Sequence, residues 1–156
     1  SFAAKGVSLW FESGRFISAS SGWLIAQVLE VKRLATKTFV ILDTGIHHLG
    51  GMAGLGRVPR GAVTLFNLSR DVSAEPLMTA DIVGPLCTPL DSLARGFKIP
   101  FVESGDLIGI PNVGAYGLTA SLLAFLSHPP PIEVTHELGH ECEAWQLRHG
   151  HEQISA

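Results

Sequence analysis

Glycine and proline punctuate this chain so densely that short strands suit it better than long helices. The 17 glycines and nine prolines stand between short apolar runs, a pattern typical of strands joined by turns. With 46% hydrophobic residues, the 156-residue chain also holds enough apolar material for one full core. We therefore predict a mainly β chain, an antiparallel β-barrel or sandwich whose strands follow one another as a meander.

The apolar runs indicate where the strands should lie. Val7–Phe11 is predicted to be a buried strand that ends at the charged turn 12–15. A short helix near Ser20–Ala26 should run into a strand near Gln27–Arg33. Further strands are expected at Thr38–Asp43, Ala62–Leu68, Asp106–Pro111 and Ile132–Thr135, and a strand-like run at 81–86. The glycine-rich stretch 46–61 is expected to be a long loop, and the residues from His136 a polar, charged tail.

Charge and cysteine content exclude several classes of protein. The formal net charge is −3, and the lysines and arginines form no cluster, so we expect neither nucleic acid nor a membrane surface as a partner. No run reaches the roughly 18 apolar residues of a membrane span, and no basic-then-apolar start marks a secretory signal. We therefore expect a cytoplasmic protein in which Cys87 and Cys142 are free thiols.

Three loops place reactive side chains beside glycine or proline. They are Glu12–Arg15, Cys87–Asp91 and Gly114–Gly117, and each follows a strand-like run. Pro85 and Pro89 restrict the backbone around the cysteine, so that this loop should be stiff. Taken alone, the second loop favours a plain interpretation, in which the cysteine is buried and the aspartate caps its own turn.

The order of these motifs resembles one family of enzymes. The patterns Glu-Pro-Gly-Arg, Asp-x-Gly, Gly-Pro-x-Cys-x-x-x-Asp, Gly-Asp and Gly-Ala-Tyr occur in sequence from Glu12 to Tyr116, with Ser13 in place of the first proline. This is similar to the C-terminal portion of the pyridoxal-phosphate decarboxylases of fold type III, the family of diaminopimelate and ornithine decarboxylases. The resemblance covers roughly residues 9–134, and it makes Asp43 and Gly45 a structural turn.

The resemblance implies pyridoxal 5'-phosphate as the cofactor. Glu12 matches the carboxylate that keeps the pyridine nitrogen protonated, so that the ring accepts electrons when CO2 departs. Gly14 would let the backbone approach the phosphate, and Arg15 would contact phosphate or a substrate carboxylate. Tyr116, the only tyrosine of the chain, matches the residue whose hydroxyl reaches the phosphate. A strand-end glutamate, a surface ion pair and a half-buried aromatic are the plain alternatives for these side chains.

Cys87 matches a catalytic cysteine that family members insert into the active site of the partner subunit. The resemblance therefore implies a homodimer with active sites at the subunit interface. Asp91 matches the last residue of the same motif, and we count it with Thr88, Arg15 and Tyr116 as a candidate for substrate binding. For Asp91, we expect a role in bracing the loop or the subunit contact more than a role in the chemistry.

Departures from the family pattern bear on the substrate. Thr88 stands where many relatives carry an acidic residue that holds a distal amino group. Gly51 and Leu55 stand where diaminopimelate decarboxylases carry arginine and tyrosine. The pair His47-His48 and the stretches 86–91 and 125–131 resemble a subgroup found with polysaccharide-export or natural-product clusters, some of whose relatives act on carrier-bound amino acids. The predicted substrate is therefore a free or a carrier-protein-bound amino acid.

The Schiff-base lysine of this family lies in an N-terminal (β/α)8 barrel. None of Lys5, Lys32, Lys37 and Lys98 stands in a matching motif, so we expect the cofactor to be attached outside this chain and the chain alone to be inactive. The predicted division is residues 1–30 for the last strand, turn and helix of the barrel, 31–135 for the β domain and 136–156 for a polar tail. The missing barrel would be another part of the polypeptide or a separate chain.

Other functions stay open. His136-Glu137-Leu138-Gly139-His140 fits the His-Glu-x-x-His pattern, which on a helix binds zinc in metallopeptidases. Gly139 weakens a helix there, so we expect a tail without metal, and we expect His47-His48 on a loop surface rather than as a ligand pair. A racemase of the same cofactor family and a non-catalytic binding or regulatory relative are the remaining alternatives.

Overall fold

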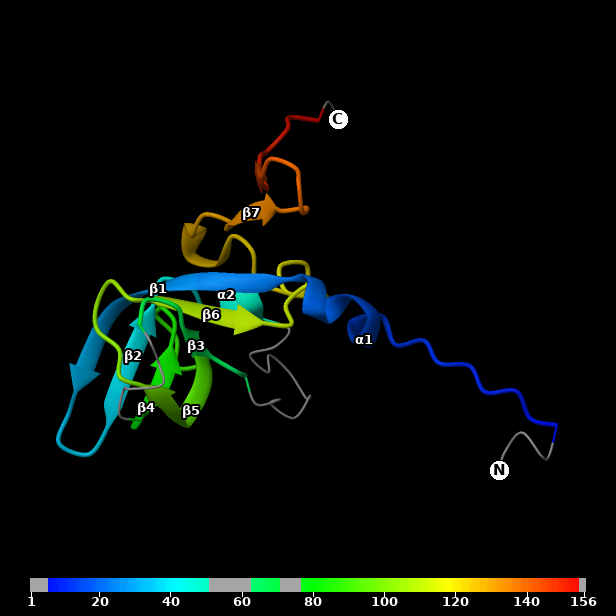
Figure 1. Ribbon diagram of the computed structural model, residues 1–156. Coiled ribbons are helices and arrows are strands. Elements are labelled where there is room, and N and C mark those ends of the chain that lie inside the picture. The colour runs from blue at the N-terminus through cyan, green and yellow to red at the C-terminus, as the bar shows by residue number, and fades with distance from the viewer. Residues whose placement is uncertain (1–5, 51–62, 71–76, 155–156) are drawn as a thin grey trace.

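One curled six-stranded sheet forms the centre of the computed structural model, which describes residues 6–50, 63–70 and 77–154 (Figure 1). The strands lie in the order β3-β6-β1-β2-β4-β5. Their bounds are β1 Trp23–Arg33, β2 Thr38–Leu42, β3 Phe66–Asn67, β4 Leu77–Val83, β5 Ser92–Pro100 and β6 Leu107–Pro111. A second, two-stranded sheet pairs β7 Ile132–Thr135 with β8 Glu143–Gln146. The prediction of a mainly β chain is confirmed.

Strand β1 organises the sheet because its two halves have different partners. Residues 23–27 pair antiparallel with β6, and the second half of the strand pairs antiparallel with β2. The pairing of β2 with β4 is parallel, which differs from the expected antiparallel meander. The connection between these two strands is long, and a long crossover can return the chain in the same direction, whereas a tight hairpin cannot.

The hydrophobic core lies within the curl of the sheet. Alternate residues of the strands point into it, as the period of two in a β-strand requires. Its least exposed side chains include Val28, Val40, Leu42, Ile82, Ile99, Ile108 and Ile110. Each such side chain contributes roughly 1.5–3 kcal/mol when it leaves water, so this core supplies the main stabilisation of the sheet.

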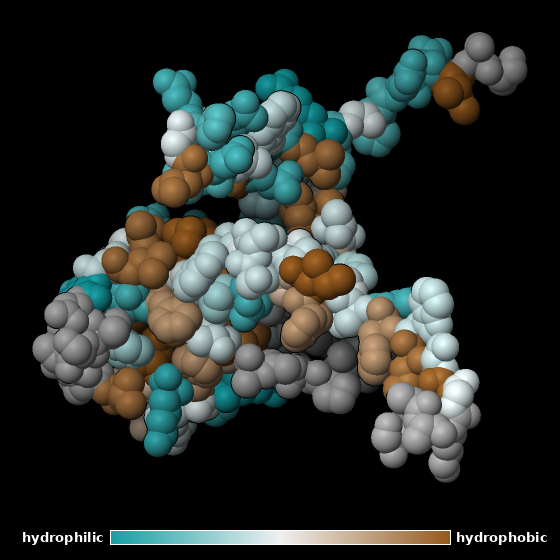
Figure 2. Space-filling model, turned by 45° about the vertical axis from the view of Figure 1, so that its right-hand side comes forward, coloured by the Kyte–Doolittle hydropathy of each residue, from teal (hydrophilic) through white to brown (hydrophobic). Residues whose placement is uncertain are grey.

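The N-terminal segment differs from its predicted form. Val7–Phe11 is not a strand, and Trp10 and Phe11 are 90% and 86% exposed. Figure 2 shows this arm projecting from the rest of the molecule with apolar side chains along it. A strand needs a neighbour for its backbone hydrogen bonds, and within the described ranges no strand pairs with this segment.

The helices also differ from their predicted positions. The helix expected near Ser20–Ala26 lies earlier, as α1 Gly14–Ser18 with a 3₁₀ turn after it, so that β1 begins at Trp23 instead of Gln27. Within the expected loop 46–61, residues 46–49 form α2 Ile46–Leu49, while residues 51–61 lie outside the described residues. Ile46 and Leu49 are one turn apart and fully buried, and this burial favours the helical turn over the local glycine content.

Two strands differ from prediction in extent, and β5 was not predicted. Strand β4 covers Leu77–Val83, where the predicted run was 81–86. Of Ala62–Leu68 only Phe66–Asn67 forms β3, and residue 62 is not described. Strand β5 contains Arg95, Gly96 and Lys98, which dilute its apolar pattern. It lies at the edge of the sheet beside β4, and charged residues are common on edge strands.

The end of the chain forms a hairpin. Strand β7 is confirmed at Ile132–Thr135, and β8 pairs with it from within the predicted polar tail. All residues of both strands are exposed, and Figure 1 shows the hairpin standing beyond the six-stranded sheet. The predicted domain boundary after residue 30 falls inside strand β1, and the one after residue 135 falls inside the hairpin. The domain division itself stays a prediction.

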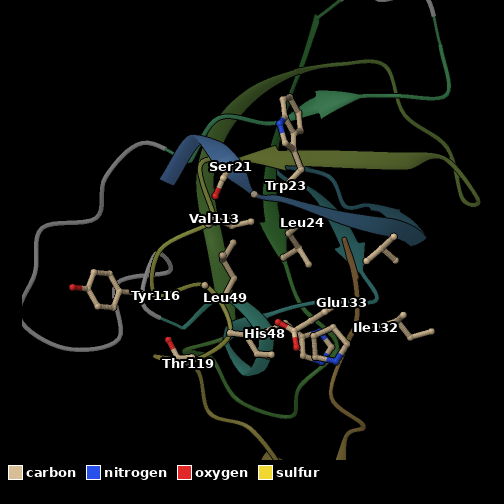
Figure 3. A pocket seen from close by; sticks show the side chains of 16 residues that line it. Ser21, Trp23, Leu24, His48, Leu49, Val113, Tyr116, Thr119, Ile132 and Glu133 are labelled. Carbon is tan, nitrogen blue, oxygen red and sulfur yellow. The ribbon is translucent and has the colours of Figure 1, made fainter. Parts of the chain in front are cut away.

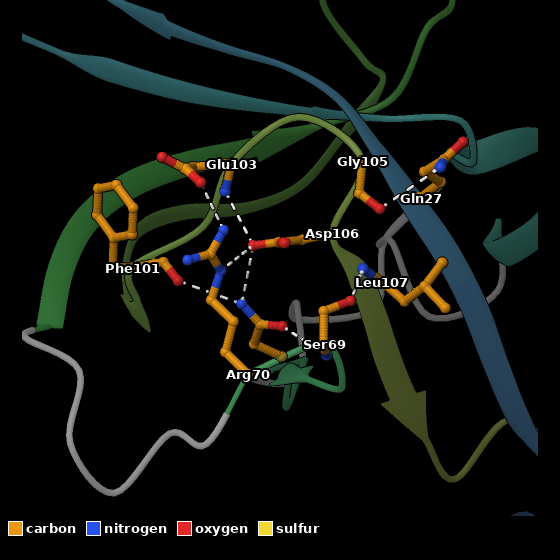
Figure 4. A network of polar contacts seen from close by, with 9 residues as sticks. Gln27, Ser69, Arg70, Phe101, Glu103, Gly105, Asp106 and Leu107 are labelled. Carbon is orange, nitrogen blue, oxygen red and sulfur yellow. Dashed lines mark hydrogen bonds and ion pairs between the residues drawn. The ribbon is translucent and has the colours of Figure 1, made fainter.

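A polar network joins β3 to the turn before β6 (Figure 4). The carboxylate oxygen Oδ2 of Asp106 accepts hydrogen bonds from Arg70 Nε at 2.8 Å, Asn67 Nδ2 at 3.2 Å and the backbone N–H of Glu103 at 2.9 Å. Burial opposes ionisation of Asp106, but the bonds from Arg70, Glu103 and Asn67 together lower the pKa of this carboxyl. The network therefore holds an ionised carboxylate in a nearly buried position.

Candidate active site

The structure brings the first and last predicted motifs together. Arg15 in α1 places its guanidinium carbon 5.4 Å from the ring centroid of Tyr116, which lies in the loop after β6. A Cβ atom at Gly14 would lie 3.7 Å from the Tyr116 hydroxyl oxygen, which is an ordinary contact distance. Two motifs separated by about a hundred residues of sequence therefore form one polar group at the surface.

Glycine at position 114 explains how the two segments approach each other. The backbone N–H of Gly114 donates to the carbonyl of Ala19 at 3.0 Å, and that of Val113 donates to Gly22 at 3.0 Å. A Cβ atom at Gly114 would lie 2.2 Å from the carbonyl oxygen of Ser18, so no larger residue fits. The loop reaches Tyr116 with a positive φ of 59°, a conformation that non-glycine residues adopt only where the surroundings hold them.

A cavity of about 330 Å³ lies beside this group (Figure 3). It is lined by the start of β1, by the loop that carries Tyr116, by α2 and by β7. The lining side chains include Ser21, Trp23, His48, Thr119 and Glu133. In Figure 3 the Tyr116 ring points away from the other labelled side chains. Tyr116 is 54% exposed, so its side chain is accessible to a ligand or to another polypeptide segment.

The cysteine loop carries one exposed and one buried candidate. Cys87 is a free, exposed thiol. Asp91 is only 3% exposed, and its carboxylate accepts the backbone N–H groups of Ile46 and Leu86, both at 2.8 Å. Thr88 uses its hydroxyl to accept the N–H of Leu90. These contacts favour the bracing role for Asp91, because both of its oxygens are already engaged.

The remaining predicted residues stay apart from the tyrosine group. Glu12 is exposed in the arm before α1 and makes no hydrogen bond or ion pair with another described residue. Cys87 does not line the cavity beside Tyr116. Asp43 accepts the N–H of Gln27 at 2.9 Å, as expected of a structural turn. Of the predicted site residues, only Gly14, Arg15 and Tyr116 lie together within the described part of the chain.

A cluster of histidines was missed by sequence reasoning. His47 is 2% exposed, in contrast to the predicted loop surface, and its ring lies 3.8 Å from that of His48 and 4.9 Å from that of His128, centroid to centroid. Within the described residues neither ring nitrogen of His47 has a hydrogen-bond partner. Burial, with the neighbouring His48 and His128, lowers the pKa of His47 to about 4. The apolar residues at both ends of α2 were the signal for this burial.

The His-Glu-x-x-His stretch, the zinc-binding alternative of the sequence analysis, does not form a helix. Residues 136–140 lie in the connection between β7 and β8, where His136 Nδ1 is 3.4 Å from Cys142 Sγ. In the parts of the chain that the structure describes, no group of three or more potential metal ligands comes together. The metallopeptidase alternative therefore loses the helical face on which it depends.

Comparison with known proteins decides the family. The family model described as "Pyridoxal-dependent decarboxylase, C-terminal sheet domain" matches residues 15–114. The chain belongs to this family of pyridoxal-dependent decarboxylases. The matched residues begin at Arg15 and end at Gly114, so the match includes Arg15 and the glycine that lets the tyrosine loop approach, and it stops two residues before Tyr116.

Curated and solved relatives agree with this assignment. The chain is 38% identical over 125 residues to the L-glutamyl-[BtrI acyl-carrier protein] decarboxylase of Niallia circulans. This alignment covers 79% of this chain and 29% of the relative. It is 41% identical over 113 residues to the diaminopimelate decarboxylase of Archaeoglobus fulgidus, covering 72% and 26%. The crystal structure of the Helicobacter pylori diaminopimelate decarboxylase complexed with L-lysine superposes with a TM-score of 0.68 at 30% identity, covering 83% of this chain and 30% of that one.

The chain thus spans less than a third of the length of these relatives. What it shares with them is the C-terminal sheet domain. Among the residues that the structure describes, no helix has the length and apolar character needed to cross a membrane.

Proposed function

We propose that this chain is the C-terminal sheet domain of a pyridoxal-phosphate-dependent decarboxylase that removes the α-carboxylate of an amino acid. The observation that carries the proposal is the convergence of Gly14, Arg15 and Tyr116 at one exposed position. A guanidinium, a phenolic hydroxyl and an unobstructed backbone are together suited to a phosphate group, because each donates hydrogen bonds or lets the ligand approach closely.

The residues present fit the phosphate end of the cofactor. Arg15 and Tyr116 are both exposed, and the Tyr116 hydroxyl lies 3.7 Å from where a Cβ atom at Gly14 would stand. When bound, pyridoxal phosphate supplies an electron sink for the pair of electrons left by CO2. In our proposal Arg15 and Tyr116 hold and orient the phosphate, and Glu12 keeps the pyridine nitrogen protonated. The attachment lysine would lie outside this chain.

Cys87 is proposed to act across a subunit boundary. Its thiol is exposed on a loop braced by Asp91, and it does not line the cavity beside Tyr116. A homodimer whose active sites lie at the subunit interface would bring Cys87 of one subunit to the substrate of the other. Thr88 on the same loop would then face the substrate. A cytoplasmic location stays part of the prediction.

A carrier-bound amino acid is a second candidate for the substrate. The relative from Niallia circulans carries a name that specifies a glutamyl group on an acyl-carrier protein, and it is 38% identical to this chain. Thr88 supports this choice, because an uncharged side chain at this position offers no ion pair to the distal amino group of diaminopimelate. Racemase, purely regulatory and zinc-peptidase functions receive no support from these relatives.

Cofactor titration of the full polypeptide that carries this sequence tests the proposal. Tyr116→Phe and Arg15→Gln should each raise the dissociation constant for pyridoxal phosphate about tenfold, the loss expected for one hydrogen bond to a charged group. Arg33→Gln is the matched control, because Arg33 also lies over an aromatic ring, with 5.8 Å from its guanidinium carbon to the Phe101 centroid. Unchanged affinity in both test variants would show that this group does not bind the phosphate.

Turnover separates the remaining roles. Glu12→Gln should reduce the rate of CO2 release while the cofactor stays bound. Mass spectrometry of products from free diaminopimelate and from a glutamyl-loaded carrier protein would identify which substrate loses CO2. A polypeptide that binds the cofactor and decarboxylates neither substrate class would contradict the proposed reaction.

A further inference from the structure

Helix α2 is held at both ends by side chains of other loops. At its start, the N–H of Ile46 donates to Asp91 Oδ1 at 2.8 Å, and Asp91 Oδ2 accepts the N–H of Leu86. After its end, the N–H of Gly50 donates to Ser121 Oγ at 2.8 Å, and this hydroxyl donates to the carbonyl of Gly117. One short helix therefore connects the loop of Cys87 to the loop of Tyr116.

These connections leave the helix little freedom to move. Asp91 fits against two glycines, since a Cβ atom at Gly45 or Gly84 would lie 2.1 or 2.2 Å from its carboxylate oxygens. Ile46 is 1% exposed and anchored in the core, and its carbonyl accepts the N–H of Leu122 at 3.3 Å. Because protein interiors are close-packed, a shift of α2 would have to move both loops together.

We propose that α2 is a spacer that fixes the Cys87 loop relative to the Tyr116 loop, with Asp91 and Ser121 as the positioning residues at its two ends. The spacer is a property of this chain alone. Its functional consequence rests on the proposed function. In a homodimer whose active sites lie at the subunit interface, Cys87 and Tyr116 of one subunit would belong to different active sites. The position of α2 would then couple the geometry of one active site to that of the other.

Amide hydrogen exchange of the full polypeptide tests the spacer without an activity measurement. Ser121→Ala removes both hydrogen bonds at the far end of α2. Peptides over 84–92 should then exchange at least about fivefold faster, because a single lost hydrogen bond of ordinary strength already gives about this factor. Ser121→Thr keeps the hydroxyl and should restore slow exchange. The reciprocal variant Asp91→Asn should raise exchange over 117–122.

Ser104→Ala is the matched control. This variant likewise removes a serine hydroxyl, which donates to the carbonyl of Leu29 at 2.8 Å, and it should leave exchange over 84–92 unchanged. If Ser121→Ala speeds exchange only over 117–122, the proposal that α2 is a spacer is wrong. An equal increase throughout β4 and β5 would also contradict the proposal, because it would reflect general destabilisation. If Tyr116→Phe and Arg15→Gln both leave cofactor affinity unchanged, the proposed phosphate site fails, while the exchange result still decides the spacer.

Discussion

Replacement of Gly45 by alanine should destabilise this domain far more than an ordinary surface change. Gly45 has an extended backbone, with φ −162° and ψ −151°, so alanine introduces no backbone strain there. Its Cβ atom, however, would lie 2.1 Å from Asp91 Oδ1. The carboxylate must therefore move away from the N–H groups of Ile46 and Leu86. Each of these charge-assisted bonds is worth about 1.5–3 kcal/mol, so we expect a loss of about 3–6 kcal/mol.

Urea denaturation with hydrogen-exchange detection on β1 and β4 would measure this loss for the domain itself. Gly96→Ala is the control, because a Cβ atom at Gly96 meets nothing within 4 Å and only its φ of +57° resists substitution, at a cost of about 1 kcal/mol. In an Asp91→Ala background, Gly45→Ala should cost little, since the obstructing carboxylate is gone. A cost of about 1 kcal/mol in the wild-type background, or the same cost in both backgrounds, would refute this reasoning.

Three further outcomes follow from the described contacts. The folded-state pKa of His47 is lowered to about 4, so the stability conferred by the neutral ring is full above pH 6.5 and falls as the pH drops toward 4. His47→Leu should therefore make the free energy of unfolding, measured in urea, less dependent on pH over this window. An unchanged pH dependence would contradict this expectation. Arg70→Gln should cost about 1–3 kcal/mol, because Asp106 then loses its cationic partner; thermal denaturation measures this. Metal analysis should find no stoichiometric zinc bound through 136–140, since this segment is not helical, and a zinc content abolished by His140→Ala would reverse that conclusion.

Local sequence pattern predicted the parts of the fold whose residues carry their own signal. Thr38–Leu42 is β-branched and apolar, and β2 forms there because such side chains pack well on a pleated surface. Strand β5 carries charges and a glycine, so its pairing with β4 decided its structure where its composition did not. Val7–Phe11 has a strand-like composition without a paired neighbour among the described residues, and composition alone does not satisfy a backbone.

The candidate site divides in the same way. The motifs from Glu12 to Tyr116 could be found by sequence, because a turn motif depends on residue types at short spacing. The contact of Arg15 with Tyr116, the engagement of both Asp91 oxygens and the burial of His47 join residues distant in sequence. Sequence by itself determined the strand-rich class and the order of the chemical motifs. Only the tertiary structure decided which of their side chains meet, because packing between distant segments sets distance, burial and pKa.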